Sequence, residues 1–133
     1  MSGEPSGLTR RLAEITTGFF QATLGLNPKR VHVLDEIEDG DLIVIKVEGF
    51  MTEAEAALAE RHEDQRLLGE YYARVLERLS PTLRVAVEGL AQRPLLRCRT
   101  TLDLSADQCR YLLSLGRRIG EESLSSRTAG ESK

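Results

Sequence analysis

An apolar stripe near the start of the chain most constrains what this sequence can fold into. The apolar side chains recur at steps of four, three, four, three and four residues, at Leu8, Leu12, Ile15, Phe19, Ala22 and Leu26. This spacing places them on one face of an amphipathic helix. Because Gly25 tolerates a positive φ and Pro28 cannot continue a helix, we expect the helix to end between these two residues.

Two strands are predicted directly after this helix. Valines alternate with polar neighbours in residues 30–35, and residues 41–50 contain a β-branched run that is too short for a helix. The acidic connection between them contains Gly40, which suits a tight turn. Two strands joined by so short a loop most simply form an antiparallel hairpin.

Helical signals return after the second strand. Thr52 and Glu55 match a capping box, in which each side chain accepts a hydrogen bond from the backbone amide of the other, so a helix should start here. A longer helical pattern follows at Leu68, Tyr72, Val75, Leu79, Leu83, Val87 and Leu90. Ser80-Pro81 interrupts this pattern, either as a kink or as an N-cap followed by proline at the first helical position.

The last part of the domain alternates again. Residues 95–104 place apolar and small side chains on one side and Arg97, Arg99 and Asp103 on the other. Residues 108–115 fit a strand that pairs with this one, and they also fit a short helix that starts at a second capping box. The sequence predicts an α+β fold in the order α-β-β-α-α-β-β, with helices on one face of a small, mainly antiparallel sheet.

Length and composition indicate one soluble domain. The chain has 133 residues, which fits a single domain at residues 8–115 with a flexible leader at 1–7 and a polar, disordered tail at 116–133. The net charge of −3 and the scarcity of aromatic residues argue against nucleic-acid binding. No apolar run is long enough to insert into a membrane. Cys98 and Cys109 are predicted to be free thiols in a reducing cytoplasm, and no zinc motif or cofactor motif is present.

Several of these residues together resemble the MpsC-type domain family. The resemblance lies in Gly25-x-x-Pro28 before a hairpin, in the strand and helix start that contain Glu48, Gly49, Thr52 and Glu55, and in the later long helix and strand. It spans residues 8–115 and departs from the family at Asn27, where a second glycine is expected before Pro28. In the family the last element is β-like, which favours a strand at residues 108–115.

The resemblance implies a function that composition alone does not. The family is named for a bacterial system that translocates sodium and generates membrane potential. A member is expected to be a non-enzymatic, cytoplasmic subunit or regulatory module that docks on a membrane cation-translocating complex. No catalytic residues are established for the family, so we assign none. Because a small sheet has edges that need covering, a homodimer is also expected.

The candidate site residues are basic and acidic side chains near the strands. Four arginines, Arg93, Arg97, Arg99 and Arg110, are predicted to form a basic face for a partner or ligand, or else a solvated outer face with local ion pairs. Glu48 and Glu55 are carboxylates for which structural roles are favoured over acid–base chemistry. The alternative function is a sensor of a small anion or nucleotide, bound near Arg97, Arg99 and the helix start at residues 49–52.

Overall fold

The computed structural model describes residues 7–37 and 41–117. Most of the predicted leader, the centre of the predicted turn at residues 38–40 and most of the predicted tail lie outside these residues. The elements within them are α1 (Gly7–Phe19), a π-helical turn (Phe20–Leu24), β1 (Arg30–Ile37), β2 (Leu42–Glu48), α2 (Glu53–Leu58), α3 (His62–Leu76), a 3₁₀ turn (Glu77–Leu79), α4 (Ser80–Ala91), β3 (Leu95–Asp103), a second 3₁₀ turn (Leu104–Ala106) and β4 (Gln108–Leu115). The predicted α+β class and element order are confirmed.

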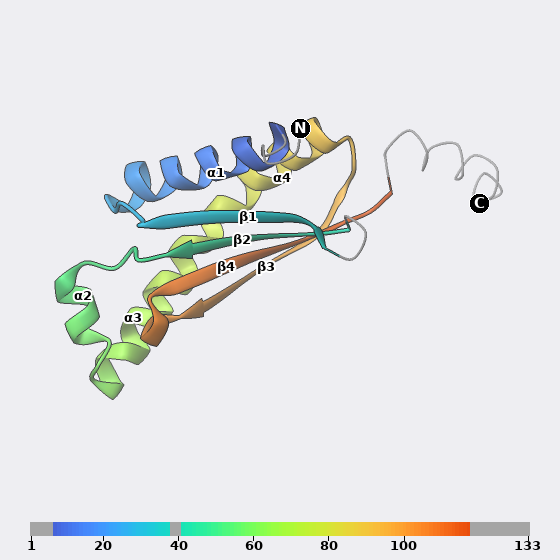
Figure 1. Cartoon of the computed structure of the whole chain (residues 1–133). Coiled ribbons are helices and arrows are strands. Elements are labelled where there is room, and N and C mark those ends of the chain that lie inside the picture. The colour runs from blue at the N-terminus through green and yellow to red at the C-terminus, as the bar shows by residue number, and fades with distance from the viewer. Residues whose placement is uncertain (1–6, 38–40, 118–133) are drawn as a thin grey trace.

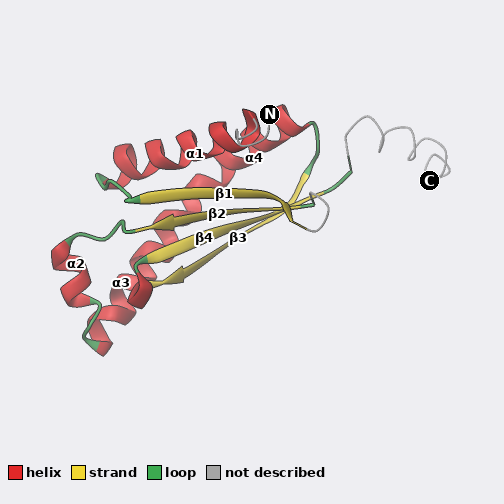
Figure 2. Ribbon diagram, viewed as in Figure 1, coloured by secondary structure: helices red, strands yellow, loops and turns green. Residues whose placement is uncertain are grey.

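The four strands form one antiparallel sheet in the order β1-β2-β4-β3 (Figure 2). β1 and β2 form the predicted hairpin, and β4 pairs with both β2 and β3. The ambiguous segment at residues 108–115 is therefore a strand, placed in the middle of the sheet. It alternates between buried and less buried side chains because one face of the sheet packs against the helices.

α1, α3 and α4 lie on one side of this sheet, and α2 lies beyond the ends of the strands, next to α3 (Figure 1). α1 packs beside β1 and against α4, while α3 packs against β3. Their apolar faces cover the inward side chains of the two central strands, which are Ile43, Ile45, Val47, Cys109, Tyr111, Leu113 and Leu115. The core is therefore a single layer between the helices and one sheet face.

The first helix follows the predicted stripe with one change of phase. Its last turn, Phe20–Leu24, is π-helical and ends at Gly25, which has the left-handed conformation expected of it (φ 69°). The wider turn carries Phe20 into the core with no solvent exposure, whereas Ala22 is exposed, contrary to the stripe. Phe20 then contacts Phe50 edge-to-face, with 5.5 Å between the ring centroids.

Ser80 and Pro81 mark a change of helix type. A 3₁₀ turn separates α3 from α4, and α4 carries its proline in the first turn, where a missing amide is tolerated. Ser80 is not the N-cap that one of the two alternatives expected, because Leu79 occupies that position without a side-chain hydrogen bond. The Ser80 hydroxyl instead lies 3.4 Å from Cys98 Sγ. Leu90, the last apolar residue of the helical pattern, lies in α4 and is 52% exposed.

Candidate functional site

The face of the sheet that points away from the helices is the main candidate site. No described helix or turn covers it, and we call it the open face (Figures 1 and 2). Residues directly opposite each other in antiparallel strands point to the same face, so the strand register gives its membership. The register places its side chains in four rows that run across the strands.

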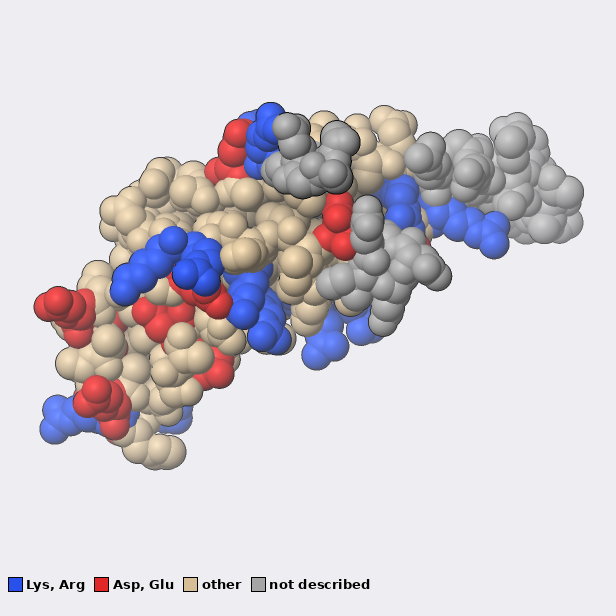
Figure 3. All heavy atoms as spheres, in the orientation of Figure 1, with Lys and Arg blue, Asp and Glu red and all other residues tan. Residues whose placement is uncertain are grey.

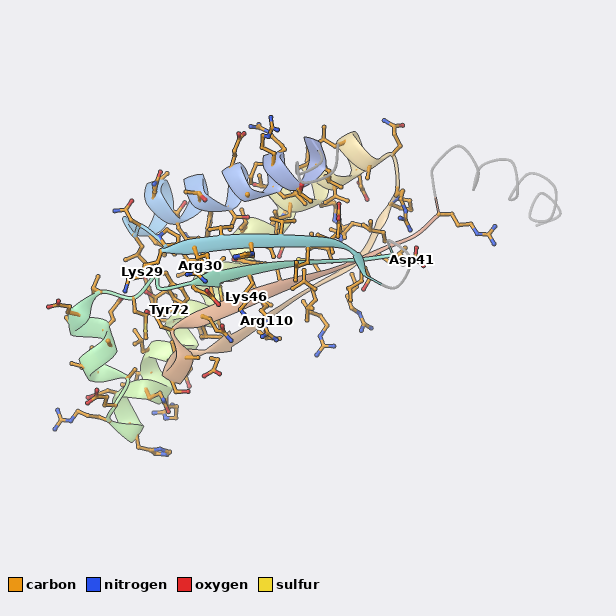
Figure 4. The ribbon with its side chains drawn as sticks, in the orientation of Figure 1. Lys29, Arg30, Asp41, Lys46, Tyr72 and Arg110 are labelled. Atoms are coloured by element: carbon orange, nitrogen blue, oxygen red, sulfur yellow. The ribbon has the colours of Figure 1, made fainter. Side chains whose placement is uncertain are left out.

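Two of these rows lie side by side and differ sharply in character. The basic row contains His32, Lys46, Arg110 and Thr101, in the order of the strands. The apolar row contains Leu34, Val44 and Leu112 and ends at Arg99. Figure 4 shows Lys46 and Arg110 on neighbouring strands, on the side of the sheet away from α1. An apolar strip beside cations is thus partly exposed on the sheet, most of all at Leu34.

The two outer rows complete the open face. One contains Leu42, Ser114 and Arg97, and the other contains Arg30, Glu48, Gln108 and Asp103. Across all four rows the face carries five Lys or Arg side chains and two Asp or Glu. The whole chain carries 18 Lys or Arg and 21 Asp or Glu, so positive charge is concentrated here. Figure 3 shows Lys and Arg side chains on this view of the molecule, with Asp and Glu side chains among them.

The structure brings together three of the four arginines named from the sequence. Arg97 and Arg99 project from β3 onto the open face, and Arg110 projects from β4 one row further along. All three are exposed.

Arg93 does not join these three arginines. It lies in the loop between α4 and β3, where its Nε donates to the Gly116 carbonyl at 2.6 Å and its Nη2 contacts Asp41 Oδ1 at 2.5 Å. The Asp41 carbonyl in turn accepts from the Leu115 amide at 2.9 Å. Arg93 therefore ties the ends of β2 and β4 together, which is a structural role.

Glu48 lies on the open face, as its place on the strand predicts, and is held by two cations. Its carboxylate is 3.1 Å from Lys46 Nζ and 3.6 Å from Arg30 Nη1. The hydrogen bond from Lys46 is the largest cause that holds the pKa of Glu48 below its usual value. Glu48 is thus an ionised carboxylate within a surface ion-pair cluster, and its pKa does not suit a general acid.

The helix start at residues 49–52 does not offer free amides to an anion. The Gly49 amide donates to the Asp107 carbonyl at 2.9 Å. The amides of Phe50 and Met51 both donate to Asp107 Oδ1 at 3.0 Å, and the Thr52 amide donates to Glu55 Oε1 at 3.1 Å. All four donors are occupied by the protein itself. Arg99 is also distant from this helix start. It lies four residues along β3 from Asp103, whose row adjoins residues 49–52, so the two rows are roughly 13 Å apart.

The predicted capping box is confirmed. Thr52 Oγ1 accepts from the Glu55 amide at 3.1 Å, and Glu55 Oε1 accepts from the Thr52 amide. Glu55 Oε1 also accepts from the buried Tyr72 hydroxyl at 2.8 Å. Burial is the main reason that the pKa of Tyr72 is strongly raised, and the hydrogen bond to Glu55 raises it further. This carboxylate orders the junction of α2 and α3.

Other chemistry is sparse in the part of the chain that the structure describes. No group of three or more His, Cys, Asp or Glu side chains there is placed to hold a metal ion. None of the helices within residues 7–37 and 41–117 is both long and apolar enough to cross a membrane. Cys98 and Cys109 are free thiols, and burial raises the pKa of Cys109 to about 12.

Sequence reasoning missed two parts of this arrangement. The apolar row was hidden because residues 42–45 read as one continuous apolar run, with no alternation to separate the two faces of β2. Asp107 was treated only as part of a possible capping box, whereas its carboxylate serves amides more than fifty residues away. Asp107 lies between a turn and β4, and its neighbours in the sequence gave no signal of that contact.

Comparison with known proteins bears on the whole folded part of the chain. No curated protein and no solved structure matches it. A family model does match, over residues 6–116, and it covers all the described helices and strands. The chain therefore belongs to the MpsC family, whose description is Na+-translocating membrane potential-generating system (MpsC).

Proposed function

We propose that this chain is a non-enzymatic, cytoplasmic subunit or regulatory module of a Na+-translocating, membrane-potential-generating system. Membership of the MpsC family supports the connection with such a system. In this proposal the chain docks on a protein partner that belongs to the membrane complex. It also acts as a homodimer.

The open face is the observation that carries the docking proposal. Val44 and Leu112 sit in the middle of two adjacent strands, and Leu34 beside them is 49% exposed. Burying apolar side chains of this kind supplies affinity, while charges around them supply orientation and speed of association. Because cations dominate the face, the partner segment that fits it is acidic with apolar side chains between the acids.

A protein partner is favoured over a bare lipid surface for a geometric reason. The apolar side chains lie in a cross-strand row beside cations, whereas a membrane-surface element typically presents an amphipathic helix with protruding apolar residues. A rigid sheet instead suits a complementary rigid or extended protein segment.

The test is co-purification with the native membrane complex. The tagged protein is isolated from its own host in mild detergent and the bound components are identified by native mass spectrometry. We expect an integral-membrane protein to accompany the wild type and to be lost from the double variant K46E/R110E. The matched control R10E/R61E makes the same change in charge away from the open face, and it should retain the partner.

Four results would count against the proposal. Recovery of the wild type without any integral-membrane protein would contradict it, and so would equal retention by K46E/R110E. Binding of the purified protein to anionic vesicles with the same dependence on Lys46 and Arg110 would assign the face to lipid. A small bound mass in place of a protein would favour an anion sensor, and the mass would give the class of the ligand.

A further inference from the structure

β3 is an edge strand whose outer side pairs with no element in the described part of the chain. Seven consecutive residues, from Arg97 to Asp103, pair with β4 without a register shift, and the one irregularity lies at its start, between Leu95 and Arg97. Exposed, regular edge strands offer unpaired backbone donors and acceptors to another chain. Proteins usually protect such edges or use them.

The opposite edge of the sheet is less regular than β3. β1 contains a register shift between Leu34 and Ile37, which interrupts its edge. α1 packs beside β1, and the groove between them is lined by side chains from both elements. Bulges and covering helices are the usual ways to block strand addition. Helices α3 and α4 also pack against β3, so the two edges differ in the regularity of their pairing, and β3 is the edge better suited to add a strand.

Thr100, at the centre of the regular part of β3, carries a second sign of a missing partner. Within the described residues, its Oγ1 is the one buried side-chain nitrogen or oxygen without a hydrogen bond. It lies opposite Tyr111 and so faces the helix side of the sheet. Buried hydroxyls in native proteins nearly always find a partner. Because this atom has no exposed surface in the single chain, the Thr100 side chain turns about χ1 to meet a hydroxyl that a second chain brings to the edge.

We propose that β3 pairs antiparallel with β3 of a second copy of this chain, about a two-fold axis at Thr100. This pairing joins two four-stranded sheets into one sheet of eight strands. The two threonines lie directly opposite each other, where hydroxyl side chains of facing strands hydrogen-bond. The same register sets Arg97 of each copy opposite Asp103 of the other, and Arg99 opposite Thr101.

The charges of β3 select this register over its neighbours. An axis at Arg99 sets two guanidinium groups against each other, and an axis at Cys98 sets Arg97 against Arg99. An axis at Thr101 pairs Arg99 with Asp103, but it leaves the Thr100 hydroxyl opposite Leu102 and uses only five residues of β3. The axis at Thr100 gives two ion pairs and uses all seven regular residues.

The geometry of Asp103 is compatible with this second partner. The hydrogen bonds that it accepts from the Ser105 hydroxyl at 2.7 Å and the Ala106 amide at 3.2 Å both fall on Oδ1. Oδ2 can therefore accept from Arg97 of the second copy. Because the axis is perpendicular to the sheet, the helices of both copies lie on the same side and the two open faces become continuous. The dimer does not depend on the docking function. It would double the area of the open face that a partner can contact.

The first experiment measures mass in solution with charge variants. We expect the wild type to have twice the 14.8 kDa mass of the chain by light scattering at micromolar concentration. R97D should be monomeric, because it sets an acid opposite each Asp103, and R97D/D103R should be dimeric again. R99D is the matched control and should remain dimeric. A monomeric wild type, or loss of the dimer in R99D but not in R97D, would overturn the proposal.

The second experiment reads the register directly and does not depend on the Asp103 variant, which loses a turn cap. In a C98S background, T100C places two thiols at facing positions, within the roughly 4.4–6.8 Å between Cα atoms that a disulfide requires. T101C places its two thiols on a diagonal, about 7–8 Å apart. Mild oxidation should cross-link T100C into a covalent dimer, and T101C should not be cross-linked. Cross-linking of T101C alone, or of neither variant, would contradict the axis at Thr100.

Discussion

Tyr72 donates its buried hydroxyl to Glu55 Oε1 at 2.8 Å, which ties the middle of α3 to the first turn of α2. The same oxygen accepts from the Thr52 amide, so one carboxylate completes a capping box and satisfies a buried phenol. Glu55 is one of the two carboxylates that could have suggested acid–base chemistry. Its contacts instead account for it as the residue that sets the angle between two helices.

Replacing Tyr72 by phenylalanine tests the strength of this tie. The Y72F variant keeps the ring packed against Phe50 and loses only the hydrogen bond to Glu55. We expect the free energy of unfolding to fall by about 1 kcal/mol in urea denaturation. The neighbouring Y71F, at a half-exposed position, is the control and should change stability by less than about 0.5 kcal/mol. Equal effects in the two variants would show that the bond contributes nothing.

The two fully buried tyrosines predict an alkaline limit to stability. Burial is the largest cause that raises the pKa of Tyr72 and of Tyr111 above the ordinary value of 10.0. Above pH 10 the unfolded chain releases these phenolic protons and the folded chain keeps them, so the free energy of unfolding falls as pH rises. The contribution is fully present below pH 10. Chemical denaturation between pH 8 and 11 should show this fall, and the free energy of unfolding should fall less steeply with pH in Y72F. An equal fall in Y72F and the wild type would contradict the raised pKa of Tyr72.

The thiols should react in a fixed order. Burial raises the pKa of Cys109 to about 12 and also raises that of the half-buried Cys98. Since the thiolate is the reactive form, Cys109 should resist alkylation in the folded protein at pH 8. Mass spectrometry after a timed pulse of iodoacetamide should find the label on Cys98 first, and on Cys109 only after denaturant is added. Rapid labelling of native Cys109 would mean that β4 opens readily.

Gly49 is required by its conformation and by its neighbour. Its φ is +68°, and a Cβ atom there would lie 2.7 Å from Lys29 Cγ. We expect G49A to lower the free energy of unfolding by about 2 kcal/mol, from backbone strain and this contact together. Gly89 in α4 has open space around it, so G89A should raise stability by about 0.5–1 kcal/mol. Thermal denaturation of both variants measures the contrast, and a neutral G49A would contradict it.

The sequence was a good guide wherever a local pattern reports a local structure. The capping box at Thr52 and Glu55, the helix end at Gly25 and the β1–β2 hairpin all follow from residues within a few positions of one another. Periodicity was less reliable where the helix changed type, because a π turn shifted the phase at Phe20. Local patterns did not decide between a strand and a helix at residues 108–115, because a central strand depends on pairing with two distant strands.

The candidate site could be predicted only in part for a related reason. Alternation along β3 placed Arg97 and Arg99 on one side, and the strand register then added Arg110. Arg93 looked equivalent in the sequence, but a loop carries it to Asp41 and Gly116 at the end of the sheet. The apolar row depends on which side of β2 the helices cover, because residues 42–45 are all apolar. A single sequence does not state that choice when both sides are apolar.

Asp107 gives the sharpest test of a long-range contact that local patterns missed. Its carboxylate accepts from the amides of Phe50 and Met51, and its own φ is 54°, in the left-handed region. D107A removes both acceptors and places alanine in a strained conformation, so we expect a loss of about 2–3 kcal/mol in the free energy of unfolding.

Two further variants separate these two causes. D107G relieves the backbone and loses only the hydrogen bonds, for an expected loss of about 1–2 kcal/mol. D107N keeps an acceptor oxygen and tolerates the left-handed conformation, so its loss should be below about 1 kcal/mol. Urea denaturation of the three variants should therefore rank D107A as the least stable and D107N as the most stable. If D107G were as stable as the wild type, the hydrogen bonds of the carboxylate would add nothing to stability. The residue at position 107 would then matter only because it must adopt the left-handed conformation.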